Sequence, residues 1–515
     1  MFFPLQSEQF FFVNLHTNIN FRTIPIMNFI SLITKEKKEM LERKDLPKYL
    51  LLKEMLNSII FQTPALFGEN LTSTRILSTT LKLSRSTVIH AYELLVFEGT
   101  VFPKKGSAYK ISYKHKALPQ PNKLINNEVG YPEISEAGKN FYKNVNIMDS
   151  ISDESIAFRP GLPPLDIFPV NLWKKLLNQY WHNVKASSLT YSNSSGIIAL
   201  RRNLAYYLNI TRGIKCNEDQ IIIVSGSLQS LFLSGFALIN LDDHVIVENP
   251  TFPNVHSVFK SLNAKIFETP IEKEGIDLSM IPEFVKPKII HVTPSNHYPT
   301  GVKMSLERKN ELLKYAKKNS SIIIENDYDH EISNWDKREP SLFELDKDNR
   351  TIFLGTFNRL LHPSIRIGYM VVPYYLVNHI KAIQKHSHRF VSPSDQSVLS
   401  EFIRKDYIFF HIKNVIECAE EREYYLKKII NSSLQIENSE SRSLHLLANI
   451  PQNLSDLKFR EILKLHNIIL HSYSSCFISN PKQGIIIGHS AVRKPLMEEK
   501  IKEIIRLYKL FVNDI

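Results

Sequence analysis

The sequence predicts a multidomain protein with two folded parts of different class: a small helical N-terminal part and a large C-terminal α/β part with a mostly parallel sheet. Three observations support this division. The chain has 515 residues, too many for one compact core. A basic stretch near the N-terminus shows helical periodicity, and later apolar strand-like runs alternate with helical runs, as they do in βαβ units.

The composition is that of a globular protein in a reducing compartment. Hydrophobic residues make up 43% and charged residues 23% of the chain, and no run of about 18 apolar residues could span a bilayer. We therefore expect a cytoplasmic protein with no membrane partner. The cysteines are too scattered for a disulfide framework or a metal site: Cys216, Cys418 and Cys476.

The first 44 residues are interpreted as an N-terminal extension. The apolar patches before Met27 lack a basic start and a continuous apolar core, so they do not indicate a signal peptide. We expect the stretch before Met27 to be disordered or to precede the true start of the protein.

Positive charge is concentrated between residues 47 and 116. Ten Lys or Arg face four Glu in this stretch, a net +6 out of the formal +12 of the whole chain. A basic cluster of this kind is expected of a module that binds the phosphate backbone of nucleic acid. The rest of the positive charge accompanies a general enrichment in Lys and carries no such indication.

Residues 45–113 predict three short helices and a hairpin. Leu52, Met55, Leu56 and Ile59 share one helical face, Thr72 or Ser73 can cap a second helix, and a turn at Lys82–Ser84 starts a third. The second helix is expected to point Ile76, Leu77 and Leu81 inward, and the third to bury Val88, Ala91, Tyr92 and Leu95. Two strands around a Lys-Lys-Gly turn complete a pattern that fits either a winged helix-turn-helix or a generic helical domain with a basic face.

The stretch "LTSTRILSTTLKLSRSTVIHAYELLVFEGTVFPKKG" resembles the GntR-type DNA-binding domain over nearly its whole length. The resemblance implies that Arg75 contacts phosphate and that the recognition helix opens with a polar cluster. It also implies a wing tip that reaches the minor groove. Thr72 departs from the proline usual in the family. The DNA-binding residues carried over are Arg75, Ser84, Arg85, Ser86, Thr87, Lys105 and Gly106.

Residues 114–154 mix Pro, Asn, Lys and Glu without a sustained period and are interpreted as a linker. Residues 155–515 show the alternating strand-like and helical pattern of an α/β domain. The strand-like runs are "QIIIVSG", "HVIVENP", "KIIHVTP", "SIIIENDY", "RTIFLGTF" and "IRIGYMVVP". Their alternation with helical runs argues for a helix-covered, largely parallel sheet.

Short polar motifs follow these strands, where ligands bind in open α/β sheets. "SGSLQS" passes from a strand through Gly226 into a helix whose amides could hold a phosphate, although such turns are common. With "ENPTFPN", "TPSNHYPTG", "ENDYDHE" and "GTFNRLLHPSIRIGY", it resembles the class I, fold type I aminotransferase-like domain of pyridoxal phosphate proteins. An aminotransferase-like domain joined to a GntR-type domain resembles the MocR subfamily of transcription regulators, and this combined resemblance extends from residue 45 to 512.

The resemblance implies a set of cofactor-binding positions. Ser227 and Arg366 match phosphate ligands, Phe252 matches the residue stacked on the pyridine ring, and Tyr328 matches the tyrosine near the ring hydroxyl. Thr356 and Asn358 match the loop that flanks the phosphate. Three of these positions differ from the residues usual in the family: Leu228 replaces a glutamine, Phe252 a tyrosine and Asn358 a serine.

Asn326 is one of two more serious departures. It stands where the family has the aspartate that faces the ring nitrogen. A carboxylate keeps that nitrogen protonated, which makes the ring an electron sink, whereas an amide supplies only a dipole. Asp327 should not substitute, because adjacent side chains on a strand point to opposite faces.

Arg359 is the second serious departure from the family pattern. It falls where the family has the Schiff-base lysine, and Arg366 keeps the expected spacing of seven residues, which opposes a shifted register. A guanidinium stays charged at any workable pH and cannot attack an aldehyde. Ile486 stands where a substrate-carboxylate arginine is expected, in a looser alignment.

These features favour a DNA-binding transcription regulator, active as a homodimer on double-stranded DNA, with a catalytically degenerate aminotransferase-like domain for effector binding and dimerisation. Pyridoxal 5′-phosphate would bind noncovalently if it binds, and an anionic or phosphorylated effector is a further candidate. The alternative is a working pyridoxal phosphate-dependent aminotransferase fused to a DNA-binding domain. A third interpretation makes the large domain a pure dimerisation scaffold.

Overall fold

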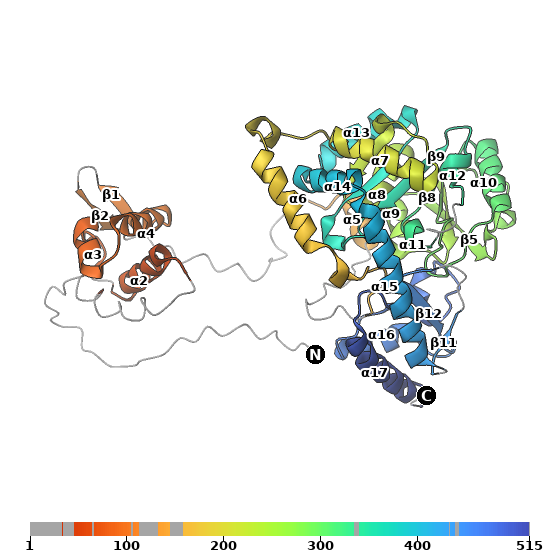
Figure 1. Cartoon of the computed structure of the whole chain (residues 1–515). Helices are drawn as coiled ribbons and strands as arrows, with labels where there is room; N and C mark the ends of the chain where they lie inside the picture. The colour runs from red at the N-terminus through yellow and green to blue at the C-terminus, as the bar shows by residue number, and fades with distance from the viewer. Residues whose placement is uncertain are drawn as a thin grey trace. The chain divides into compact units, whose positions relative to one another are not determined.

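The computed structural model describes residues 33, 46–63, 66–104, 107–112, 132–144, 158–333, 339–431, 433–437 and 442–513. The chain divides into two compact units, Met1–Pro132 and Glu133–Ile515, both drawn in Figure 1. None of the described helices has the length and apolar composition needed to cross a membrane.

Three helices build the core of the first unit: α2 (Lys48–Gln62), α3 (Thr74–Leu81) and α4 (Arg85–Phe97). The predicted apolar stripes are buried there, with one exception. Ile76 is 52% exposed, so its inward orientation was predicted wrongly, because Leu77 and Leu81 already fill the buried face of the short helix α3. The buried stripe residues are Leu52, Met55, Leu56, Ile59, Leu77, Leu81, Val88, Ala91, Tyr92 and Leu95.

The turn and the hairpin of this unit also follow the predicted layout. Lys82 adopts the left-handed conformation with φ 52° and ends α3. Strands β1 (Val101–Lys104) and β2 (Ser107–Ile111) pair antiparallel. Lys105 and Gly106, expected at the wing tip, lie outside the described residues.

An eight-stranded sheet forms the centre of the second unit, in the order β3-β10-β9-β8-β7-β4-β5-β6 (Figure 1). All six strand-like runs of the sequence are strands in it. The β4, β5, β7, β8 and β9 neighbours pair parallel, whereas β10 pairs antiparallel with β3 and β9, and β6 with β5. The strands are β3 (Ile221–Val224), β4 (His244–Asn249), β5 (Lys265–Glu272), β6 (Gly275–Ile276), β7 (Pro287–Val292), β8 (Ile322–Asn326), β9 (Thr351–Thr356) and β10 (Gly368–Val371).

Helices cover both faces of this sheet. The strands are apolar on both sides, so that Ile222 and Val224 pack on one face and Ile221 and Ile223 on the other. One face carries α8 (Ser227–Leu238), α9 (Pro253–Ser261) and α13 (Tyr374–Ser387). The other carries α6 (Val170–Asn183), α7 (Ile198–Arg212), α10 (Leu306–Asn319), α12 (Leu342–Leu345), α14 (Pro393–Arg404) and α15 (Tyr407–Ile430). The short helix α11 (His330–Ser333) follows β8.

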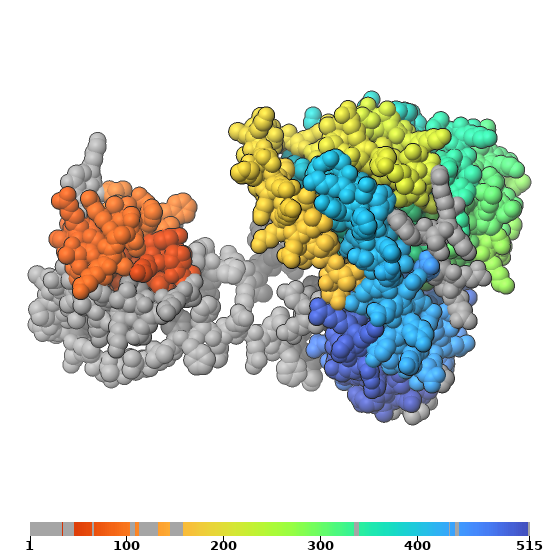
Figure 2. Space-filling model, in the orientation of Figure 1, coloured from red at the N-terminus to blue at the C-terminus, as the bar shows by residue number. Residues whose placement is uncertain are grey.

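A second, four-stranded antiparallel sheet lies towards the C-terminus, in the order β11-β12-β14-β13. Helix α15 joins the two cores, because Ile412 and Val415 pack in the main core and Leu426 and Ile430 in the smaller one. The blue C-terminal segments and the lighter blue α15 form one continuous surface in Figure 2. The elements are β11 (Gln435–Ile436), β12 (His445–Asn449), α16 (Asp456–Leu465), β13 (His471–Ser472), β14 (Gly484–Gly488) and α17 (Lys494–Asn513).

The range interpreted as a linker contains a helix, α5 (Glu136–Asn144), which packs on α9 in the second unit. Asn140 holds it there: its amide nitrogen donates to the carbonyl oxygens of Lys260 and Ser261 at 3.0 and 3.1 Å. The ring of Phe141 lies 6.1 Å from that of Phe232. Part of the range interpreted as a linker is therefore folded, although its sequence shows no sustained apolar period.

Candidate functional sites

The polar cluster at the start of α4 is organised around Ser84. Its hydroxyl accepts a hydrogen bond from the Thr87 amide at 3.1 Å and lies 2.9 and 2.7 Å from the hydroxyl oxygens of Ser86 and Thr87. A capping serine fixes the direction in which the helix starts. The first turn of α4 therefore presents hydroxyl groups and Arg85 to solvent.

Arg75 and Arg85 are both exposed, and neither forms an ion pair with any described residue. Arginines in this state keep their donors available for phosphate oxygens or guanine edges. Lys53, by contrast, is paired with Glu98 at 2.7 Å. The first unit therefore presents two exposed cations near helix starts: Arg75 in the first turn of α3 and Arg85 at the start of α4.

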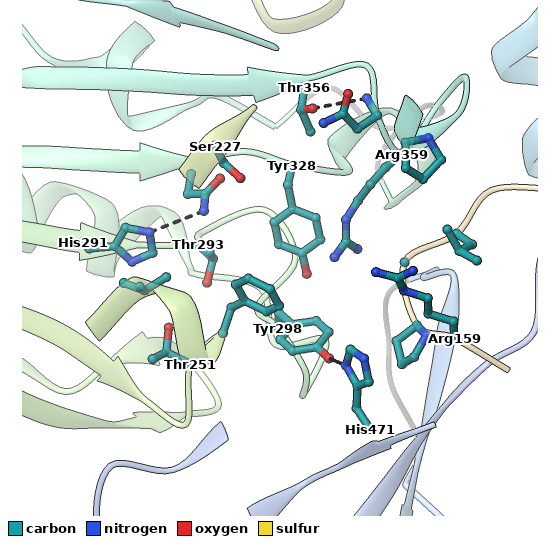
Figure 3. Close-up of a pocket in the computed structure, with 18 residues that line it drawn as sticks. Arg159, Ser227, Thr251, His291, Thr293, Tyr298, Tyr328, Thr356, Arg359 and His471 are labelled. Atoms are coloured by element: carbon teal, nitrogen blue, oxygen red, sulfur yellow. Dashed lines mark hydrogen bonds between the residues drawn. The ribbon is translucent and has the colours of Figure 1, made fainter. Parts of the chain in front are cut away.

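A cavity of about 250 Å³ opens in the second unit where β4, β7, β8 and β9 end and α8 and α9 begin (Figure 3). It brings together seven of the nine positions carried over from the family resemblance: Ser227, Phe252, Asn326, Tyr328, Thr356, Asn358 and Arg359. Four segments far apart in the sequence therefore supply one site.

The two remaining positions face elsewhere. Leu228, 46% exposed, and Arg366 line a neighbouring groove with α5 and α9 residues. Arg366 is exposed and left-handed, with φ 51°. In this structure the predicted phosphate arginine does not line the cavity that holds the other seven.

One end of the cavity is suited to a phosphate group. Ser227 is the first residue of α8, after Gly226 with φ 142°, a conformation that favours glycine. Free amides and the dipole at such a helix start favour an anion. Thr356 Oγ1 accepts from the Asn358 amide at 3.2 Å and so fixes the loop beside it.

The Asn326 side chain enters the cavity, and that of Asp327 turns away as expected. Asn326 Nδ2 lies 3.4 Å from His291 Nε2. The Asp327 Oδ2 atom lies 2.7 Å from Arg212 Nε, in the buried interior. Burial lowers the pKa of His291 to about 3, so this imidazole is neutral, and Asn326 and His291 together present no charge to the cavity.

Arg359 reaches across the cavity. Its guanidinium carbon lies 4.3 Å from the ring centroid of Tyr328 and 5.9 Å from that of Tyr298, both within cation–π range. Its Nη1 atom is buried without a hydrogen-bond partner among the described residues. The Tyr328 hydroxyl donates to the Asn296 carbonyl at 2.9 Å and is already engaged.

The other residues that line the cavity were not singled out from the sequence, and four of them carry a guanidinium, imidazole or phenol group: Arg159, His291, Tyr298 and His471. His291 and Tyr298 belong to strand-end runs, so their position was a usable signal. His471 lies on the two-residue strand β13, and nothing in its local sequence indicates the site. Its Nδ1 atom lies 3.3 Å from the Tyr298 hydroxyl.

A buried polar network supports the ends of β8. Arg212 Nη2 donates to Ser295 Oγ at 3.0 Å, and its Nη1 donates to the Glu339 carbonyl at 3.0 Å. The Tyr207 hydroxyl donates to Glu331 at 2.7 Å. This network holds Asp327 away from the cavity and thereby fixes which side of β8 Asn326 occupies.

Comparison with known families identifies the class. Residues 161–479 match the model of aminotransferase class I and II. The chain belongs to this family, whose members in general have the capacity to bind pyridoxal phosphate. With its N-terminal helical unit, the chain has the organisation of a MocR-type helix-turn-helix transcriptional regulator.

The relatives support this organisation along the chain. The chain is 28% identical over 468 residues to the probable rhizopine catabolism regulatory protein MocR of Rhizobium meliloti, covering 89% of this chain and 93% of the relative. It is 28% identical to the helix-turn-helix transcriptional regulator YdeL of Bacillus subtilis, covering 86% and 93%. The α-aminoadipate aminotransferase LysN of Thermus thermophilus has the same fold, with TM-score 0.66, 19% identity and coverage of 73% and 98%.

The cavity does not fit pyridoxal phosphate as a covalent, electron-withdrawing cofactor. No lysine is among the described residues that line the cavity, so none of them supplies an amine for the aldehyde, and the guanidinium of Arg359 stays protonated. Asn326, which the family resemblance places opposite the ring nitrogen, offers an amide in the cavity, and its neighbour His291 is neutral. The phosphate end remains, so the residues suit an anion that is held without a covalent bond.

Proposed function

We propose that this protein is a DNA-binding transcription regulator of the MocR type whose aminotransferase-like unit binds an anionic effector without catalysis. The regulator assignment is supported by the similarity to MocR and YdeL over more than four fifths of the chain. It is also supported by the exposed start of α4, where Ser84 caps the helix beside Ser86 and Arg85, because a recognition helix contacts bases with its N-terminal residues.

The observation that carries the loss of catalysis is the place of Arg359. Its guanidinium lies inside the cavity, stacked on Tyr328, where an amine nucleophile would be needed. A fixed positive charge at this position attracts an anion instead. We propose that pyridoxal phosphate, or another phosphorylated compound, binds here noncovalently.

A homodimer is the proposed active form, with paired half-sites on double-stranded DNA because two-fold protein symmetry favours them. Lys105 and Gly106 are proposed to contact DNA with Arg75, Ser84, Arg85, Ser86 and Thr87. A monomer in light scattering, both free and on DNA, would contradict this assembly.

The test of the regulator function is selection of a duplex from a random pool by the full-length protein, followed by footprinting of the selected sequence. We expect one protected sequence and steep weakening by salt, because Arg and Lys displace condensed counterions. Binding without sequence preference would overturn the proposal. Transamination by the unmodified protein would favour the alternative of a working aminotransferase.

A further inference from the structure

Two arginines reach the cavity on the side of Tyr328 away from Ser227, as Figure 3 shows. Arg359 comes from the loop after β9, and Arg159 comes from the segment that precedes α6. The two segments touch, because a Cβ atom added at Gly161 would lie 2.7 Å from the guanidinium carbon of Arg359. One end of the cavity therefore carries two positive charges.

These charges are not neutralised by the protein. Neither arginine forms an ion pair with any residue that the structure describes, and none of the described residues lining the cavity is Asp or Glu. The carboxyl of Asp329 lies near Arg359, but burial raises its pKa to about 8, so it is mostly protonated at neutral pH. His471 adds no charge, because burial and the neighbouring cations lower its pKa to about 4.

Polar atoms of the cavity also lack partners. Four lining side chains each have a buried atom with no hydrogen bond to a described residue: Arg359 Nη1, Asn358 Oδ1, Asn326 Oδ1 and His291 Nδ1. His291 is fully buried. Unpaired buried polar groups are costly, and four around one small cavity indicate a ligand with polar groups at several points of its rim.

We propose that Arg159 and Arg359 form a carboxylate-binding subsite, so that the ligand is a single-ring compound with a phosphate group at Ser227 and a carboxylate at the two arginines. This inference deepens the proposed function and rests on it. The guanidinium fork matches a planar carboxylate, and the rings of Phe252, Tyr298 and Tyr328 line the space between the two ends. A volume of about 250 Å³, below the roughly 300–1,000 Å³ of many ligand sites, suits one ring with short arms.

Three pyridoxyl or pyridoxamine compounds separate the two subsites, because none has an aldehyde and none can form an imine with the protein. N-(5′-phosphopyridoxyl)-L-alanine carries both anions, pyridoxamine 5′-phosphate carries only the phosphate, and N-pyridoxyl-L-alanine carries only the carboxylate. Calorimetric titration of the full-length protein at neutral pH measures the three affinities. We expect the compound with both anions to bind at least roughly tenfold more tightly than either of the others, the effect of about 1.4 kcal/mol.

Two variants assign the difference to the arginines. Arg159→Gln should remove the advantage of the carboxylate and leave the affinity for pyridoxamine 5′-phosphate within about twofold. Arg359→Gln provides the same test from the other chain segment. The matched control is Arg202→Gln, because Arg202 is exposed on α7 and pairs with Glu218. Near-ultraviolet circular dichroism checks that each variant is folded.

Equal affinities for the compounds with and without the carboxylate would overturn the proposal. A loss of all three affinities in the folded Arg159→Gln protein would do the same, because it would place Arg159 in general binding. If no compound binds while the full-length protein still selects a DNA sequence, the ligand class is wrong and the regulator function stands. If DNA selection fails while the carboxylate preference holds, the regulator function is wrong and the carboxylate-binding subsite stands.

Discussion

The guanidinium carbon of Arg359 lies 4.3 Å from the ring centroid of Tyr328. The contact places a permanent cation over an aromatic face inside the cavity, and cation–π attraction of about 0.5–2 kcal/mol holds it there. No lysine is among the described residues that line this cavity, and the proposal that Arg359 holds an anion there depends on this fixed charge.

Replacing Arg359 by Lys together with Asn326 by Asp should create covalent binding of pyridoxal phosphate. Lysine can lose its proton and form an imine, and a carboxylate restores charge at the ring-nitrogen position. We expect visible absorbance and, after borohydride reduction, a mass increase on the peptide that contains residue 359.

The unmodified protein is the control for that experiment and should show neither signal. Asn326→Asp alone should also show no adduct, because the amine is still missing. A borohydride-trapped adduct at residue 359 of the unmodified chain is chemically excluded. Residues 355–369 contain no lysine, so a specific adduct on a lysine elsewhere would show that another amine binds the aldehyde and would favour the alternative of a working aminotransferase.

Arg85→Ala should weaken binding to the selected DNA duplex by at least roughly 1 kcal/mol and reduce the salt dependence. Arg85 is exposed at the start of α4 and has no ion pair with a described residue. The matched control is Lys53→Ala, whose charge is already paired with Glu98. Fluorescence anisotropy at several salt concentrations measures both. Equal effects of the two substitutions would count against a recognition role for α4.

The sequence was sufficient for elements whose apolar period is regular. All six strand runs and the three helices of the first unit form as predicted, since residues such as Ile222 and Leu95 are placed by local spacing. The sequence also placed Asp327 correctly, because alternation along a strand is a local property. Ile76 was misassigned because a helix of eight residues can bury only a narrow face.

The features that the sequence did not reveal depend on contacts between distant segments. Helix α5 is held by hydrogen bonds from Asn140 to backbone carbonyls at the end of α9. Such polar contacts do not appear as a hydrophobic period in the sequence. The strands β11 and β13 have two residues each and are too short to show alternation. Arg159 and His471 enter the cavity from opposite ends of the second unit's sequence, so only the fold brings them together.

Breaking the buried ion pair between Arg212 and Asp327 should destabilise the second unit strongly. The pair is 2.7 Å apart with side chains 2% and 1% exposed. Asp327→Ala would leave the buried guanidinium with the more distant Glu325, 3.9 Å away, and we expect a cost of about 3–5 kcal/mol. Asp348→Ala is the matched control. It breaks a 2.8 Å pair with Lys317 whose side chains are 38% and 63% exposed, worth about 0–1 kcal/mol. Urea unfolding measures both, and similar losses would contradict the role of burial.

Asn140→Ala should release α5 from the second unit. The Asn140 amide makes the described hydrogen bonds to the end of α9 and to Asn263 Oδ1 at 2.8 Å. Hydrogen–deuterium exchange of residues 136–144 should become faster, and exchange in the main sheet should stay the same. Lys139→Ala is the control, because Lys139 pairs within the segment, with Glu136 at 2.8 Å. Unchanged exchange in the Asn140 variant would mean that apolar contacts such as Phe141 hold the helix.

Asp329→Asn should make the stability of the second unit less sensitive to pH between about 4 and 8. Burial raises the pKa of Asp329 to about 8, against the opposing effects of Arg359 and the hydrogen bond from Asn296, while Asp327 and Glu331 raise it further. The ordinary value is about 3.9, so in this window the folded state holds a proton that the unfolded state has lost. Stability therefore falls as pH rises, and above the folded pKa this contribution no longer changes.

The amide cannot titrate, so the free energy of unfolding of Asp329→Asn, measured in urea at several pH values, should decline less steeply with pH than that of the unmodified protein. A remaining slope is expected in both proteins, because burial also raises the pKa values of Glu248 and Glu331 to about 7. The exposed Asp348→Asn variant should keep the full slope. If Asp329→Asn also keeps it, Asp329 is ionised in the folded protein, it neutralises Arg359, and the cavity carries one positive charge less than proposed.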